Sequence, residues 1–340
     1  MRTSDHLLIL ALALLYSCSG NPGKQVEQQT ERPAKMVVVP VFNPDSAYDF
    51  VKKQVDFGPR IPNTAAHKNA ADYFVKQFSA YGAQVNIQDF EAMTYDNQKI
   101  FLRNIIAAFN PDKTKRILLA AHWDTRPFAD KDPQNPRALF DGANDGASGV
   151  GVLLEIARVF HENNLPEVGV DIILFDGEDW GFDTSTAESL YGNNSDFKLP
   201  KKLDSWWCLG SQYWSKNKHT PNYSAYYGIL LDMVGGKYAQ FVREGVSMEY
   251  APGIVDKVWN TASRLGYGHL FLNKKEGAIM DDHLFVNTYA KIPTINIVHY
   301  DGSEGYFGDF HHSRKDSMEN ISKETLEAVG RTLLQVIYNE

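Results

Sequence analysis

The chain has 340 residues, of which 43% are hydrophobic and 22% are charged. This is the composition of an ordinary globular protein, and the length is ample for a sizeable core. The formal net charge of -8 counts against a nucleic-acid partner, because phosphate binding needs clustered lysine and arginine side chains. The sequence holds no such cluster, and we expect no nucleic acid as a partner.

The N-terminal residues predict a signal peptide rather than a part of the fold. The apolar run 7–15 follows one early arginine and is too short to span a bilayer. Cys18 follows a Leu-Tyr-Ser sequence that resembles a bacterial lipobox, although Tyr16 is bulky for its position. We therefore expect residues 1–17 to be a signal peptide, Cys18 to carry a lipid, and residues 18–45 to form a flexible tether. An ordinary signal peptide that is cleaved nearby is the alternative.

This leader predicts where the protein works. It would be exported to the bacterial cell envelope, where it would face the periplasm or the cell surface as a lipoprotein anchored at Cys18. It would contact a membrane only through that lipid. With Cys18 lipidated, Cys208 has no partner for a disulfide, and its apolar surroundings predict a buried, inert thiol.

From residue 46 to the C-terminus, helical and strand-like patterns alternate. The predicted helices are 46–58, 65–82, 147–163, 253–266 and 322–340. The predicted strands are 83–93, 103–109, 116–124, 170–176, 225–234 and 294–300. The runs 170–176 and 225–234 are continuously apolar, which is typical of central strands buried on both faces. The alternation predicts one three-layer α/β domain, 46–340, whose mostly parallel mixed sheet has helices on both faces, with a surface insertion at 183–204.

Carboxylates and histidines gather where these strands are predicted to end. They are His122, Asp124, Asp145, Glu178, Asp179, Asp232, His311 and His312. A single aspartate in a loop is usually a turn or cap residue, but open α/β sheets bind ligands beyond the carboxyl ends of their strands. Several carboxylates and imidazoles that converge there are what a zinc ion with an open coordination position requires. In the stretch LFDGEDWGF, the carboxylates of Asp176, Glu178 and Asp179 stand within four positions. They repel one another unless a cation lies between them or one of them keeps a proton.

The motifs that carry these residues resemble a known family. They are LLAAHWDTRPF, DGANDGASGVGVLLEIARVF, LFDGEDWG, LLDMVGG, MDDHLFV and FHHSRKD. In this order they resemble the glutaminyl-peptide cyclotransferases, or glutaminyl cyclases, which are built on the zinc aminopeptidase-like fold. The resemblance covers roughly residues 46–340. It implies a zinc-dependent acyltransferase that cyclises N-terminal glutaminyl residues of peptides or proteins to pyroglutamate and releases ammonia.

The resemblance also implies roles for single residues. Three positions match the zinc ligands of the family: Asp145, Asp179 and His312. One Zn²⁺ ion per chain is therefore expected. Glu178 matches the catalytic acid/base, and Asp232 and Asp281 match two acidic residues that share hydrogen bonds around the leaving ammonia.

The substrate pocket departs from the animal members of the family. His311 stands where those enzymes have a tryptophan, and their second pocket tryptophan has no aligned counterpart because of the insertion. Trp206, Trp207 and Trp180 are the candidates to replace it, with a core role as the alternative for each. The resulting candidates for the pocket are Phe307, His311, Trp207 and Ile279.

Two other functions stay open on the sequence. Five residues match the ligands of related aminopeptidases, which carry two zinc ions and release N-terminal amino acids: His122, Asp145, Asp179, Asp232 and His312. Asp281 favours the cyclase, because the aminopeptidases have a small residue there. The other alternative is a non-catalytic binding module of the same fold. As partners we expect peptides or exported proteins that begin with glutamine, and we expect a monomer.

Overall fold

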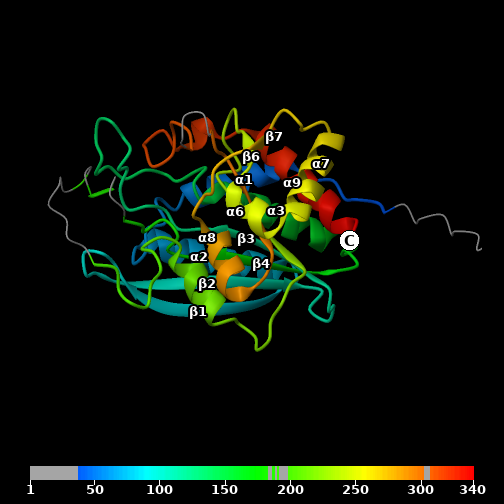
Figure 1. The fold of residues 1–340 in the computed structure, drawn as a ribbon, viewed down its shortest axis with the longest axis horizontal. Coiled ribbons are helices and arrows are strands. Elements are labelled where there is room, and N and C mark those ends of the chain that lie inside the picture. Colours follow the sequence, from blue (N-terminus) through cyan, green and yellow to red (C-terminus); the bar gives the residue numbers. More distant parts are fainter. Residues whose placement is uncertain (1–36, 183–185, 188–189, 191–197, 302–306) are drawn as a thin grey trace, which may run out of the picture. The chain divides into compact units, whose positions relative to one another are not determined.

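A six-stranded mixed sheet forms the centre of the unit Val37–Glu340 (Figure 1). The computed structural model describes residues 37–182, 186–187, 190, 198–301 and 307–340. The strands lie in the order β1 (Gln84–Met93), β2 (Lys99–Phe109), β4 (Gly169–Phe175), β3 (Arg116–His122), β5 (Tyr227–Asp232) and β8 (Thr294–Val298). Strands β4, β3, β5 and β8 are parallel, whereas β1 pairs antiparallel with β2 and β2 with β4. The predicted α/β fold with a mostly parallel mixed sheet is confirmed.

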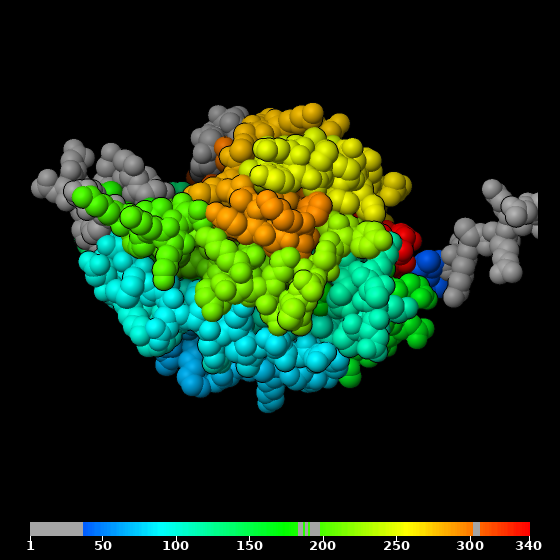
Figure 2. All heavy atoms as spheres, turned by 60° about the horizontal axis from the view of Figure 1, so that its bottom comes forward, coloured from blue at the N-terminus to red at the C-terminus, as the bar shows by residue number. Residues whose placement is uncertain are grey.

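Helices cover both faces of this sheet, so the central strands are buried on both sides. One face carries α1 (Pro44–Val55), α2 (Ala65–Ala80), α3 (Ala147–Glu162), α7 (Pro252–Arg264) and α9 (Lys323–Tyr338). The other face carries α5 (Leu209–Lys216) and the π-helix η1 (Val286–Ala290). Leu119 of β3 packs into the first core and its neighbour Leu118 into the second, because side chains alternate along a strand. In Figure 2 the light-green atoms of the region around α5 lie between the cyan atoms of β1 and β2 and the orange atoms of the region around η1.

Each predicted helix and strand has a counterpart in the structure, but several short elements were not predicted. They are α5, β6 (Phe241–Arg243), α6 (Gly245–Tyr250), β7 (Phe271–Lys275), α8 (Asp282–Phe285), η1 and the 3-10 helix η2 (Met318–Asn320). Strands β6 and β7 form a second, parallel sheet. Most of these elements span too few residues to show a period, so their sequences carry little local signal. The predicted insertion lies partly outside the described residues, and its part 198–204 has no helix or strand.

The folded unit begins earlier than the predicted domain start at residue 46. Phe42 is 1% exposed and packs against Gly330 of α9, where even a Cβ atom would lie 2.1 Å from the Phe42 ring. Asn43 caps α1 through its side chain, and its backbone N–H donates to Glu155 of α3. Phe42 and Asn43 are therefore not part of a tether, because they hold α1 against α9 and α3, and residues 44 and 45 already belong to α1.

The remaining predictions for the N-terminus lie outside the described residues. These are the signal peptide at 1–17, the lipid on Cys18 and the tether up to residue 36. Among the helices that the structure describes, none is long and apolar enough to cross a membrane.

Candidate active site

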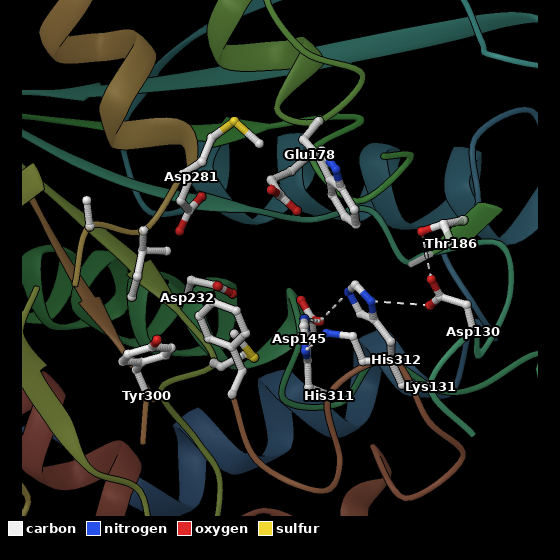
Figure 3. Close-up of a pocket in the computed structure, with 16 residues that line it drawn as sticks. Asp130, Lys131, Asp145, Glu178, Thr186, Asp232, Asp281, Tyr300, His311 and His312 are labelled. Atoms are coloured by element: carbon white, nitrogen blue, oxygen red, sulfur yellow. Dashed lines mark hydrogen bonds and ion pairs between the residues drawn. The ribbon is translucent and has the colours of Figure 1, made fainter. Parts of the chain in front are cut away.

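A cavity of about 320 Å³ lies where the parallel strands β3, β4 and β5 end (Figure 3). The residues that the resemblance assigns to the cyclase and the pocket candidates line it, except Asp179; His122 and Asp124, also predicted at the strand ends, do not. Those that line it are Asp145, Glu178, Asp232, Asp281, His312, Phe307, His311, Trp207 and Ile279. Figure 3 shows the carboxylates of Asp145, Glu178, Asp232 and Asp281 turned into the cavity. Residues that are up to 167 positions apart, such as Asp145 and His312, thus meet in one site.

The three predicted zinc ligands converge at one end of this cavity. The Nε2 atom of His312 lies 3.0 Å from Asp179 Oδ1 and 3.6 Å from Asp145 Oδ2. Ligand atoms that sit about 2.0 Å from a tetrahedral zinc ion are about 3.3 Å apart. Asp179 is 1% exposed, and its Oδ1 accepts no hydrogen bond from the described residues despite the nearby imidazole. Nitrogen and oxygen atoms that lie this close together without a hydrogen bond between them can share a bound cation. The ligand atoms of Asp145, Asp179 and His312 therefore fit zinc.

The loop before α3 is built to hold Asp145. The carboxylate of Asp316 accepts the backbone N–H groups of Asn144 and Asp145 at 2.6 and 3.0 Å. Gly146, the N-cap of α3, has φ = 67°, and a Cβ atom there would lie 2.9 Å from the His122 ring. Glycine is required at this turn because a side chain would strain the backbone and displace His122.

Asp124 sets the directions of the neighbouring carboxylates in LFDGEDWGF. Its two oxygens accept the backbone N–H groups of Glu178 and Asp179 at 3.0 and 3.1 Å. This clamp turns Glu178 into the cavity and Asp179 toward His312. Asp176 points elsewhere, since both of its oxygens lie 2.9 Å from His67 Nε2. The three carboxylates therefore have three separate environments.

Burial controls the protonation of the acidic residues that face the cavity. Burial raises the pKa of Glu178 well above its usual range; His122 opposes this, and Asp281 and Asp179 add to it. Burial likewise raises the pKa of Asp232 to about 7. A carboxylate with a raised pKa can accept and return a proton near neutral pH, which is what a general acid/base must do.

His122 connects two of these carboxylates. Its Nε2 atom lies 3.0 Å from Asp145 Oδ1 and hydrogen bonds with Asp232 Oδ1 at 3.2 Å. Burial disfavours the charged imidazole, but Asp124, Asp145 and Asp232 still raise the pKa of His122 well above its usual value. A protonated His122 donates hydrogen bonds and cannot bind a metal through the same nitrogen. His122, Asp145 and Asp232 nevertheless have donor atoms within 4.8 Å of one another, which is the arrangement that a second ion would use.

The predicted pocket residues form the walls of the cavity. The ring of Trp207 stacks on His312 with an interplanar angle of 9°, and Phe307 packs edge-on against His311. Trp180 and Trp206 instead belong to a separate buried cluster with Tyr95. Of the tryptophans near the insertion, Trp207 is therefore the one placed to contact a substrate.

Several residues that shape the site were not assigned a role from the sequence. Arg126 is fully buried and donates to both oxygens of Asp130 at 2.8 Å, and Asp130 Oδ1 lies 3.3 Å from His312 Nδ1. A carboxylate behind a ligating histidine orients its ring. Asn296 of β8 donates to Asp281 at 2.6 Å. The motif HWDTRPFAD contains Arg126 and Asp130 at i, i+4 spacing, but nothing in it reveals that they meet His312.

The fold and this site define a class of enzyme. Residues 104–337 match the family model "Peptidase family M28", and the chain belongs to that family. A solved structure of a Zn-dependent exopeptidase from Parabacteroides distasonis is 49% identical, with a TM-score of 0.83, and the match covers 89% of this chain and 100% of that one. The zinc aminopeptidase-like fold is thereby confirmed, and zinc is supported as the metal.

Within this class the chain is similar to glutaminyl cyclases. The structure of Bacteroides thetaiotaomicron glutaminyl cyclase bound to N-acetylhistamine is 48% identical, with a TM-score of 0.82, and the match covers 89% of this chain and 100% of that one. The glutaminyl-peptide cyclotransferase of Dictyostelium discoideum is 23% identical over 308 residues, which are 80% of this chain and 78% of that protein. The predicted resemblance to the glutaminyl-peptide cyclotransferases is confirmed.

Proposed function

We propose that this chain is a zinc-dependent glutaminyl cyclase. It converts N-terminal glutaminyl residues of peptides or proteins to pyroglutamate and releases ammonia. The observation that carries this proposal is the convergence of Glu178, Asp232 and Asp281 on one cavity beside Asp145 and His312. The similarity to glutaminyl cyclases over 89% of the chain supports it.

The residues of the cavity can perform each step of this reaction. Asp145, Asp179 and His312 would hold zinc, which polarises the side-chain carbonyl of the substrate when bound. Glu178 accepts a proton as the α-amine attacks that carbonyl carbon, so a carbon–nitrogen bond closes a five-membered lactam. Glu178 returns the proton to the side-chain nitrogen, whose bond to carbon breaks, and ammonia leaves. Asp232 and Asp281 orient the attacking α-amine and the leaving side-chain nitrogen. This holds the substrate in the conformer that can close the ring.

A two-zinc aminopeptidase is the second candidate, because His122, Asp145 and Asp232 form a second group of donors. Asp281 in the same cavity favours the cyclase, since the resemblance to the cyclases pairs it with Asp232 around the leaving ammonia. We therefore propose one zinc ion per chain.

One incubation separates the two candidates. The purified chain, loaded with zinc, is mixed with a peptide that begins with glutamine and a peptide that begins with leucine, and both masses are measured. We expect the glutamine peptide to lose one ammonia and the leucine peptide to stay intact. Loss of a whole N-terminal residue from either peptide would instead establish the aminopeptidase.

We also propose that the natural substrates are exported proteins that begin with glutamine, and that a monomeric enzyme reaches them as a lipoprotein of the cell envelope. The lipobox-like sequence before Cys18 supports this proposal. Cells that express the chain and are fed a labelled fatty acid should label it, and Cys18→Ser should abolish the label. Equal labelling of the unmodified chain and the Cys18→Ser variant, or no labelling of either, would contradict a lipid anchor at Cys18.

A further inference from the structure

The thiol of Cys208 lies against the catalytic carboxylate. Its Sγ atom donates to Glu178 Oε1 at 3.2 Å. The backbone N–H of Cys208 donates to the carbonyl oxygen of Glu178 at 2.9 Å, and the N–H of Leu209 donates to that of Gly177 at 3.0 Å. Cys208 thus holds Glu178 at both its backbone and its side chain, although 30 positions separate the two residues.

The backbone of Cys208 adopts an energetically unfavourable conformation that allows these contacts. Cys208 has φ = 59° and ψ = 38°, in the left-handed region that residues with a side chain rarely adopt. Gly210 follows two positions later, and a Cβ atom there would lie 2.6 Å from the backbone of Asp176. The first turn of α5 is therefore pressed against the segment that carries Glu178. Strained backbone of this kind persists where the surrounding structure holds it, often at functional sites.

The chemistry of the thiol suits it to donate a hydrogen bond rather than to react. Cys208 is fully buried, and it does not line the cavity. Burial, followed by the nearby charge of Glu178, raises the pKa of Cys208 well above its usual range. The group therefore keeps its proton at neutral pH, and it cannot act as a thiolate nucleophile.

We propose that Cys208 is a positioning residue for Glu178. Its thiol fixes one carboxylate oxygen, Oε1, so that the other oxygen, Oε2, serves the amine and the leaving nitrogen of the substrate. This inference rests on the proposed cyclase function, in which Glu178 transfers the proton. An unanchored glutamate side chain samples several rotamers, and only some of them bring the oxygen within reach of the substrate.

The test compares three substitutions in α5 and its N-cap, with turnover of a glutamine-initiated peptide as the readout. Cys208→Ala removes the donor and should lower kcat by about tenfold to a hundredfold, with KM changed less than about twofold, because a misplaced catalytic group costs rate rather than binding. Cys208→Ser restores a donor of similar size and should recover most of kcat. Ser215→Ala is the matched control. Ser215 is also a small, buried side chain of α5, but its hydroxyl has no hydrogen-bond partner among the described residues, so kcat should not change.

A second measurement depends neither on catalytic activity nor on whether the Cys208→Ala variant folds. In the full chain with Cys18→Ser, Cys208 supplies the one S–H stretching band in the Raman spectrum. We expect that band at the lowered frequency of a hydrogen-bonded thiol, and Glu178→Ala should move it to the frequency of a free thiol. Melting temperatures and zinc contents of all variants show whether the fold and the metal are kept.

The outcomes separate this inference from the proposed function. No ammonia release from the glutamine peptide by the unmodified chain would overturn the cyclase function, whereas the Raman band would still report the contact. An active chain whose Cys208→Ala variant keeps its full kcat would overturn the positioning role. So would a kcat that falls equally in the alanine and serine variants, or an S–H band that ignores Glu178→Ala.

Discussion

Glu178→Gln is expected to lower kcat by about 10³-fold, within the range of about 10² to 10⁴ that general acid–base catalysis contributes. Glutamine has the size of glutamate, and its amide oxygen can still accept from the Cys208 thiol. Its backbone N–H can still donate to Asp124. The substitution therefore keeps the shape of the cavity, but the amide cannot accept the proton of the attacking amine. The measurement is ammonia release under saturating glutamine peptide, with zinc content determined on the same sample.

The control for this prediction lies two positions earlier in the same segment. Asp176→Asn changes a carboxylate that is fully buried and is paired with His67 and the backbone of Arg103 instead of facing the cavity. We expect it to lower stability, because it weakens a buried hydrogen-bonded pair, and to leave kcat per zinc-loaded molecule nearly unchanged. If Glu178→Gln kept kcat within threefold of the unmodified chain, Glu178 would have no part in proton transfer.

The sequence predicts the long elements of this fold well because their burial is regular. Strand β3 is a continuous apolar run that is buried along its length, and helix α3 has apolar residues at helical spacing. The short elements between residues 232 and 294 offer no such signal. Strand β6 spans Phe241–Arg243, and three residues cannot display a period. The early start of the folded unit escaped prediction for another reason: the short apolar run that ends at Phe42 shows no helical or strand period, and the contact with Gly330 makes Phe42 part of the core.

Some residues of the candidate site could likewise be predicted from the sequence, and others could not. Residues that belong to quoted motifs, such as Asp145, Glu178 and His312, could be placed together because parallel strands end at one edge of a sheet. Asn296 and Cys208 could not, because each acts through a contact with a residue far away in the sequence. An asparagine inside an apolar strand and a cysteine beside two tryptophans both look like ordinary core residues. Their contribution depends on tertiary contacts that no local pattern encodes.

Asp145→Ala is expected to abolish zinc binding at stoichiometric metal. Asp145 lies 3.6 Å from His312 and 3.0 Å from His122 through its two oxygens, so it is the carboxylate that both groups of donors share. Its loss leaves two of the three predicted ligands, His312 and Asp179, and two ligands are too few for a zinc site in a protein. The affinity should fall by more than the roughly 10- to 100-fold that loss of an outer partner costs. Zinc content is measured by elemental analysis after dialysis against buffer with a weak chelator.

Two further substitutions are controls for the loss of zinc in Asp145→Ala. Asp130→Asn weakens the partner behind His312 but removes no proposed ligand, so zinc should stay bound with an affinity reduced by about 10- to 100-fold. His122→Ala removes a ligand only if a second ion binds beside Asp232, so one zinc per chain should remain both before and after this change. A fall from two ions to one would establish the two-metal site. Full zinc occupancy in Asp145→Ala would refute its role as a ligand, and the metal would then have to lie with residues other than the three that converge here.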